Sequence, residues 1–438
     1  MIAPSLPNPW NVFNLHSSPF WQDALGDGDQ THPLSLFVGR QDDLDVLVGS
    51  LFGAGSGSSR RAIAGSPGIG KTTLVKQLKA HALANGYLTT DGFVPVFADD
   101  TNESLFGRVL GAVYDILLAN RPHTVDLAPM QAAQVLVRSA REKARSGGIS
   151  LFGVGASIGQ NTTTTVPRDI LLDGPRVLRD LMTLVQSSDA QGVLVHIDNL
   201  ENLSEAGALN AGTIMRDLRD PLFMHNGLHV VVVGTPDAIQ AAITAHAQVR
   251  TTFSIRTLEP MPAADVIRLL NARYAWLQKD QDAPVIPPVD PRAAEELYAL
   301  YRGDLRGLLQ ALDDGVTPNI GLAPRRRPDR TEASIASSGV IQPLHFEDVA
   351  PTLRQEYQDQ LTALPEEHHV RRLIQWGESR GTDSQTQHRL ATLWDVRQAT
   401  VSETLSYLIG QGLVLAMPRQ GRAPIEYHLS GRSRLIFS

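Results

Sequence analysis

The segment GSPGIGKT, from Gly65 to Thr72, holds the residues best suited to chemistry in this sequence. It matches G-x-x-x-x-G-K-[ST] in full, between a strand-like run, RRAIAG, and a helical pattern, KTTLVKQLKAHALA. Glycines let backbone N–H groups turn inward around an anion, the lysine places a charge against phosphates, and the threonine hydroxyl suits magnesium. We therefore predict a site for ATP and Mg2+ formed by Gly65, Ser66, Pro67, Gly68, Ile69, Gly70, Lys71, Thr72 and Thr73.

A single aspartate, Asp198, ends the apolar run VLVHID. An aspartate at the carboxyl end of a buried strand faces the crevice where open α/β sheets bind ligands, so we expect Asp198 and Thr72 to hold Mg2+. Hydrolysis also needs a group that orients or deprotonates water, and the amide of Asn199 takes no proton at neutral pH. Glu201 is the nearby acid. Two hypotheses stay open: slow hydrolysis helped by Glu201 or a water network, and a site that mainly holds its nucleotide.

Strand-like and helical patterns alternate between residues 60 and 257, which predicts a parallel sheet with helices on both faces. The strand candidates are RRAIAG, FVPVFAD, GVLVHID, LHVVVVG and TFSIRTL. After Pro260 the pattern is helical, as in a small lid, and the Pro-, Arg- and Ser-rich run from Gly321 predicts a linker. A glycine-rich stretch at 144–169 interrupts the sheet region and predicts a flexible insert, with a functional hairpin as the alternative.

The end of the chain has the pattern of a helix-turn-helix followed by a hairpin. Apolar residues of the second helix recur at i, i+4 and i+7, and short polar side chains occupy its other face. This arrangement is typical of a winged helix that reads double-stranded DNA. Glu403 on that face would repel phosphate, so a protein-binding winged helix is the alternative. The candidate nucleic-acid contacts are Gln398, Thr400, Ser402, Arg419 and Arg422.

Several of these segments together resemble the motifs of one family. The phosphate loop, Asp198, the FVGR segment from Phe37 and the GDLR segment from Gly303 are similar in type and order to those of AAA+ ATPases related to the origin-recognition initiators. The same parts occur in STAND-like signal-transduction ATPases. The resemblance covers nearly the whole chain beyond residue 35, although only the phosphate loop is highly specific.

The resemblance implies roles for further residues. Val38, Gly39 and Arg40 would form the adenine side of the site, with Asp43 in place of the family's glutamate. Thr235, at the end of LHVVVVG, and Arg306, in the lid, would sense the γ-phosphate, although Thr235 also suits a helix cap. Arg250 would reach a neighbouring subunit's site as a finger, with Arg256 as its competitor and an ordinary surface arginine as the alternative.

Composition limits the class of protein. With 438 residues the chain suggests two or three domains, and with 46 acidic against 39 basic residues any nucleic-acid surface is a local patch. The absence of cysteine excludes disulfides and cysteine-ligated zinc. We expect no signal peptide, no membrane span and a cytoplasmic location. The expected domains are an N-terminal extension (1–35), a P-loop ATPase core (36–258), a helical lid (259–320), a linker (321–345) and a winged helix-turn-helix domain (346–438).

The predicted fold class is α/β, a P-loop NTPase parallel sheet with a helical lid, followed by an α+β winged-helix domain. The favoured function is a slow ATP hydrolase that forms a homo-oligomer and couples nucleotide state to DNA binding, in replication, transposition or mobile-element control. One alternative is a nucleotide-gated signalling or phage-defence switch with a protein partner. Another is a structural adaptor that hydrolyses nothing.

Overall fold

The structure is a computed structural model, and it describes residues 8–26, 32–54, 57–90, 92–146, 170–203, 205–320, 342–379, 384–417 and 424–438. Most of the expected insert and linker lie outside the described residues, as do Arg419 and Arg422. None of the described helices is both long and apolar enough to span a membrane.

The chain divides into two compact units, each with its own hydrophobic core. One unit comprises Leu25–Ser35 and Arg40–Glu259, and the other comprises Met1–Ala24, Leu36–Gly39 and Pro260–Ser438. We call them the core unit and the lid unit.

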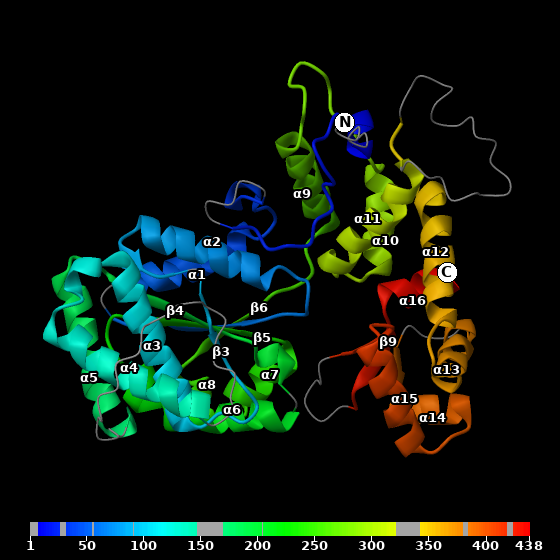
Figure 1. The fold of residues 1–438 in the computed structure, drawn as a ribbon. Helices are drawn as coiled ribbons and strands as arrows, with labels where there is room; N and C mark the ends of the chain where they lie inside the picture. Colours follow the sequence, from blue (N-terminus) through cyan, green and yellow to red (C-terminus); the bar gives the residue numbers. More distant parts are fainter. Residues whose placement is uncertain are drawn as a thin grey trace, which may run out of the picture. The chain divides into compact units, whose positions relative to one another are not determined.

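The core unit is built on a parallel sheet in the order β2-β4-β5-β1-β6, with β3 pairing β4 off this path (Figure 1). The long strands β4 and β5 are almost entirely buried, as their mostly apolar sequences predict. Because all strands run in one direction, their carboxyl ends lie at a single edge of the sheet. The strands are β1 (Arg60–Ala64), β2 (Tyr87–Leu88), β3 (Val94–Pro95), β4 (Gly192–Asp198), β5 (Leu228–Gly234) and β6 (Ser254–Thr257).

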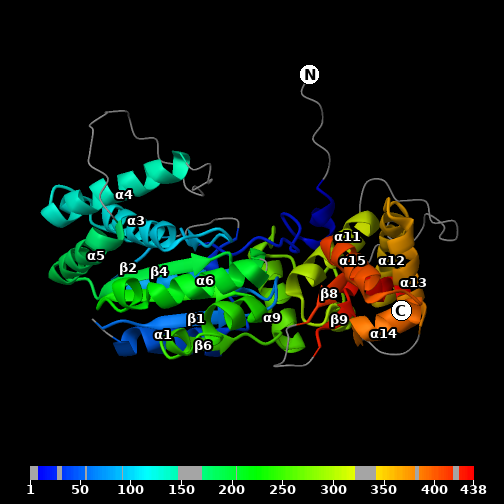
Figure 2. The same ribbon diagram turned by 90° about the horizontal axis from the view of Figure 1, so that it is seen from below.

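Helices cover the sheet on both faces. Helices α1 and α2 lie side by side on one face, and α6, α7 and α8 lie on the other (Figure 1). Helices α3, α4 and α5 pack together at the β2 and β4 side (Figure 2). The helices are α1 (Gln41–Ala54), α2 (Lys71–Ala84), α3 (Asn102–Asn120), α4 (Ala128–Ser146), α5 (Ile170–Ser187), α6 (Glu205–Asp217), α7 (Pro236–Ile239) and α8 (Ala247–Arg250).

The lid unit joins the helices after Pro260 to the last domain of the chain in a single core. Glycines mark two of these close contacts, because a Cβ on Gly315 would lie 2.4 Å from Val349 and one on Gly431 would lie 2.3 Å from Tyr301. The helices are α9 (Ala263–Trp276), α10 (Pro291–Leu300), α11 (Leu305–Ile320), α12 (Phe346–Thr362), α13 (Glu367–Glu378), α14 (Gln387–Trp394), α15 (Gln398–Gly410) and α16 (Gly431–Phe437).

The N-terminal segment belongs to this same core. Trp10, Phe13 and Phe20 are buried among the lid residues, and the Arg273 guanidinium donates to the carbonyls of Pro19 and Trp21 at 2.9 and 2.8 Å. Burial lowers the pKa of Arg273 to about 9.

A three-stranded antiparallel sheet flanks the helix-turn-helix, with β7 before its first helix and β8 and β9 after its second. Its order is β7 (Ser384–Thr386), β9 (Glu426–Leu429) and β8 (Val414–Ala416), and α14 and α15 pack beside it (Figure 1). Asp395 makes the turn between the two helices in a left-handed conformation, φ 51°. The parallel sheet and the winged helix confirm the predicted fold class.

Candidate nucleotide site

The phosphate loop connects β1 to α2 at the carboxyl edge of the sheet. Gly68 and Gly70 are left-handed, with φ 78° and 99°, a conformation that glycine adopts without strain. Gly70 caps α2 without any side-chain hydrogen bond, so the first N–H groups of this helix have no side-chain cap. The Gly65 N–H donates to the Gly234 carbonyl at 3.1 Å, which fixes the loop to the end of β5.

Lys71 is buried at the first position of α2. Its ammonium donates to the carbonyls of Gly65 and Ser66 at 3.0 and 3.1 Å, so the charge lies within the curve of the loop. Thr72, the next residue, is exposed. The loop thus presents a positive charge, helix N–H groups and a hydroxyl at one place, as an anion with a bound cation requires.

A cluster of three charged residues contacts the phosphate loop through the Ile69 carbonyl. Arg40 is buried, donates to the Ile69 carbonyl of the loop at 3.1 Å and pairs with Asp43 at 3.3 Å. Asp43 also accepts from Arg256 of β6 at 2.6 Å. Arg256 is therefore paired within its own chain.

Asp198 is the last residue of β4, and its carboxylate is held by two neighbours. The Asn199 N–H donates to Oδ1 at 2.7 Å, and Nε2 of the buried His196 lies 3.3 Å from Oδ2. Burial would raise the pKa of Asp198, but His196, the Asn199 N–H and the Lys71 charge together lower it below its ordinary value. The ionised carboxylate therefore lies within the field of the phosphate-loop lysine.

His196 is a neighbour of Asp198 that was not predicted from the sequence. Burial lowers its pKa, which keeps the imidazole neutral at neutral pH. Its ring also packs against Phe93, with ring centres 5.8 Å apart. The signal that could have found it is a polar residue within the otherwise apolar run that precedes Asp198, two positions before that aspartate.

Thr235 and Glu201 occupy the same edge of the sheet. Thr235 follows β5 directly and caps α7, its hydroxyl accepting the Ala238 N–H at 3.4 Å. The cap expected from the sequence is thus formed, next to the carbonyl of Gly234 that holds the loop. Glu201 lies in the 3-10 turn Leu200–Asn202, where the structure describes its backbone only.

The remaining candidates are distributed over both units. In the core unit, Arg250 ends α8 with an exposed side chain that makes no ion pair or side-chain hydrogen bond with the described residues. In the lid unit, Arg306 is exposed in the first turn of α11. Val38 and Gly39 also belong to that unit, where Gly39 is left-handed (φ 78°) and a Cβ on it would lie 2.9 Å from Asp265.

The second helix of the winged helix, α15, exposes Gln398 and Ser402, with Thr400 half-buried. Its buried face is anchored by a polar group, since Thr404 Oγ1 lies 3.0 Å from His369 Nδ1 and accepts from Arg372 at 2.8 Å. The helix contains no lysine or arginine between its bounds.

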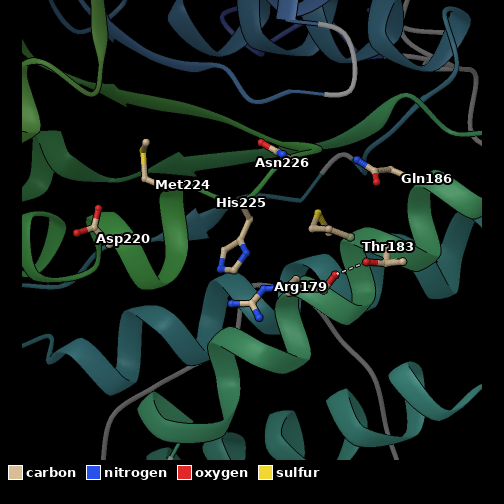
Figure 3. A pocket seen from close by; sticks show the side chains of 8 residues that line it. Arg179, Thr183, Gln186, Asp220, Met224, His225 and Asn226 are labelled. Carbon is tan, nitrogen blue, oxygen red and sulfur yellow. Dashed lines mark hydrogen bonds between the residues drawn. The ribbon is translucent and has the colours of Figure 1, made fainter.

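A separate surface pocket of about 390 Å³ lies where α5 precedes β4 and where the loop before β5 runs (Figure 3). It is therefore at the amino ends of these strands, away from the edge that carries Asp198. None of the predicted site residues lines it. The lining residues are Arg179, Met182, Thr183, Gln186, Asp220, Met224, His225 and Asn226.

Comparison with known proteins finds likeness in structure alone. No protein-family model matches the chain, and no curated protein matches its sequence. Among solved structures, the chain is similar to the Aeropyrum pernix ORC2 protein in ADPNP-ADP complexes, with a TM-score of 0.45, 16% identity and 95% of each chain covered. It is also similar to the A. pernix ORC1 protein in complex with DNA, with a TM-score of 0.40, 14% identity and 91% and 92% of the two chains covered.

A RuvB mutant from Thermotoga maritima is similar as well, with a TM-score of 0.37, 15% identity and 91% and 94% of the two chains covered. At these TM-scores and identities, the likeness to the three proteins assigns no family and no role to this chain. The class of the chain follows from its own strand order and loop: a P-loop NTPase fold with a helical lid and a winged helix.

Proposed function

We propose that this protein is an ATP-binding P-loop ATPase that hydrolyses ATP slowly and couples its nucleotide state to oligomerisation and DNA binding. The observation that carries the proposal is the convergence of the Lys71 ammonium with an ionised Asp198 at one edge of the sheet. A buried cation and a neighbouring carboxylate are what a phosphate chain with a divalent cation needs.

The residues of the core unit fit ATP and Mg2+. Lys71 and the N–H groups at the start of α2 would hold the phosphates, and Thr72 with Asp198 would hold the magnesium ion. Arg40 supports the loop through the Ile69 carbonyl. When bound, the nucleotide would supply the reacting phosphate and Mg2+ would neutralise its charge. The protein would hold both in position.

Slow turnover is proposed because the position after Asp198 offers no base. Asn199 carries an amide, and its Nδ2 already donates to the Val96 carbonyl at 3.1 Å. Glu201 remains the acid that would orient water. Arg250 is proposed as the finger toward a second copy, since its exposed side chain has no described partner.

Coupling between nucleotide and winged helix is proposed to run through the lid. Arg306 is the lid residue proposed to sense the terminal phosphate. The lid helices and the winged helix share one core. Arg302, which precedes the GDLR segment, contacts His428 Nδ1 of β9. A packed core moves as a body, so a change at the lid is carried to α15.

For DNA, the proposed contacts are Gln398, Thr400 and Ser402 of α15, with Arg419 and Arg422 of the hairpin. Arg397, the exposed N-cap of α15, would add a phosphate contact. The proposed partner is double-stranded DNA, and the site of action is the cytoplasm.

One observation favours a protein partner instead, in a nucleotide-gated switch. The helix α15 has no basic residue and exposes Glu403. Several apolar side chains at the end of α15 and around β8 and β9 are between 37% and 42% exposed, which suits a protein surface better than a phosphate backbone. They are Ile409, Leu415, Met417 and Ile425.

Turnover of ATP with and without duplex DNA separates these functions, with Lys71→Ala as the matched variant. We expect nucleotide binding that Lys71→Ala abolishes, slow turnover, and a different oligomeric mass and DNA affinity in ATP and ADP at fixed salt. Tight binding with little turnover and no DNA affinity would establish the switch. Equal mass and equal DNA affinity in the two nucleotides would refute the coupling.

A further inference from the structure

Asn199 has a backbone conformation that few residues adopt. Its φ is 77°, in the left-handed region, and this turn directs its own N–H back to Asp198 Oδ1 at 2.7 Å. Among residues other than glycine, asparagine and aspartate tolerate this region best. The bond therefore depends on the residue type at 199, although the donor belongs to the backbone.

The Asn199 side chain also joins the ends of two strands. Its Nδ2 donates to the Val96 carbonyl, and its Oδ1 accepts from the Asn202 amide. Val96 in turn donates its N–H to the Asp198 carbonyl at 3.1 Å. Residues 96, 198, 199 and 202 thus form a closed set of contacts at the carboxyl ends of β3 and β4.

We propose that Asn199 is a positioning residue, whose left-handed backbone holds the Asp198 carboxylate in the orientation that binds the magnesium ion of a nucleotide. This inference rests on the proposed function, because it needs nucleotide and Mg2+ at Asp198. The amide bonds to Val96 and Asn202 and takes no proton, so the position serves orientation of the metal ligand, through its backbone N–H, instead of proton transfer.

The same geometry says why a glutamate at 199 would not restore a base. It would lose the donor to the Val96 carbonyl. Glutamate also lacks the tolerance of asparagine for the left-handed region.

The test measures binding of a fluorescent ATP analogue to the full chain, in Mg2+ and in EDTA. The ratio of the two affinities is the magnesium gain. Asp198→Asn is expected to remove the gain. Asn199→Gly keeps the left-handed backbone and loses only the amide, so its gain should stay within about twofold of the wild type. Asn199→Ala loses the same amide and disfavours the left-handed region as well, so its gain should fall at least about threefold.

Affinity in EDTA should be the same in the wild type and in the variants at position 199, because their charge and their phosphate loop are unchanged. A residue that served only stability would lower the unfolding temperature and leave the magnesium gain unchanged. Asn199→Ser imposes a similar backbone cost with a small polar side chain, and takes the place of the alanine variant if that variant does not fold.

Equal magnesium gains in the wild type, glycine and alanine proteins would overturn the inference, and so would equal losses in the glycine and alanine variants. A wild type that binds the analogue with no gain from Mg2+ would overturn it too. A wild type that binds no analogue in either condition would overturn the proposed function itself, and the inference with it.

Discussion

Replacing Asp43 by alanine tests whether the charged cluster behind the phosphate loop supports the nucleotide site. Asp43 accepts from Arg40 at 3.3 Å and from Arg256 at 2.6 Å, and Arg40 also holds the Ile69 carbonyl. Without the carboxylate, Arg40 keeps its charge in a buried place with one carbonyl as its remaining described partner.

The expected loss in the free energy of unfolding follows from how little the two side chains are exposed. The side chains of Arg40 and Asp43 are 6% and 12% exposed, and removing one partner of a buried pair costs about 3–5 kcal/mol. The Ile69 carbonyl still compensates part of the Arg40 charge. We therefore expect Asp43→Ala to lower the free energy of unfolding by about 3 kcal/mol. The Arg256 side chain is 40% exposed, and its pair with Asp43 should contribute about 1 kcal/mol or less.

The assay is denaturant unfolding of the full chain, monitored by a probe in the core unit, for Asp43→Ala, Arg256→Ala and the double variant Arg40→Ala/Asp43→Ala. The double variant should be more stable than Asp43→Ala alone, because it carries no buried unpaired charge. The same Asp43→Ala protein should bind nucleotide more weakly. Equal destabilisation by Asp43→Ala and Arg256→Ala would refute the reasoning, since it would mean that burial of Arg40 has no energetic consequence.

Four further outcomes are expected. Lys71→Ala should abolish detectable nucleotide binding in a filter or fluorescence assay while circular dichroism stays unchanged. Gly303→Ala should destabilise the lid unit by about 2–4 kcal/mol, because φ is 83° and a Cβ would lie 2.3 Å from Pro260; a melting temperature equal to that of the wild type would contradict this. Burial lowers the pKa of His369 below 6.5, so below that pH the unfolded chain binds a proton that the folded chain does not, and stability of the lid unit should fall. Thr404→Val removes the hydroxyl partner of His369 and should destabilise the unit at pH 8 as well, measured by thermal unfolding.

Much of the candidate site was predictable because its parts are local. The phosphate loop is a continuous segment whose glycines and lysine have one physical use in that order. The apolar run before Asp198 placed that residue at the end of a buried strand, and Thr235 followed a second such run. These predictions needed only the alternation of strands and helices.

The contacts between distant segments were not predictable in the same way. Nothing in the sequence pairs Asp43 with Arg256, which lies 213 positions later. The N-terminal segment was expected only as an extension, yet Trp10, Phe13 and Phe20 complete the core of the lid helices. Apolar residues without a clear period carry no signal of which surface they cover.

The sequence by itself determined the class of fold and the chemistry of its loop, because periodicity, glycine spacing and residue type act within a few positions. Only the tertiary structure decided what Asn199 does. As a sequence feature it was an amide that cannot take a proton. In the folded chain its positive φ directs its backbone N–H to Asp198 Oδ1, while its side-chain amide bonds to Val96 and Asn202. The left-handed conformation of Asn199 occurs where the ends of two strands meet, and no local sequence pattern indicates it.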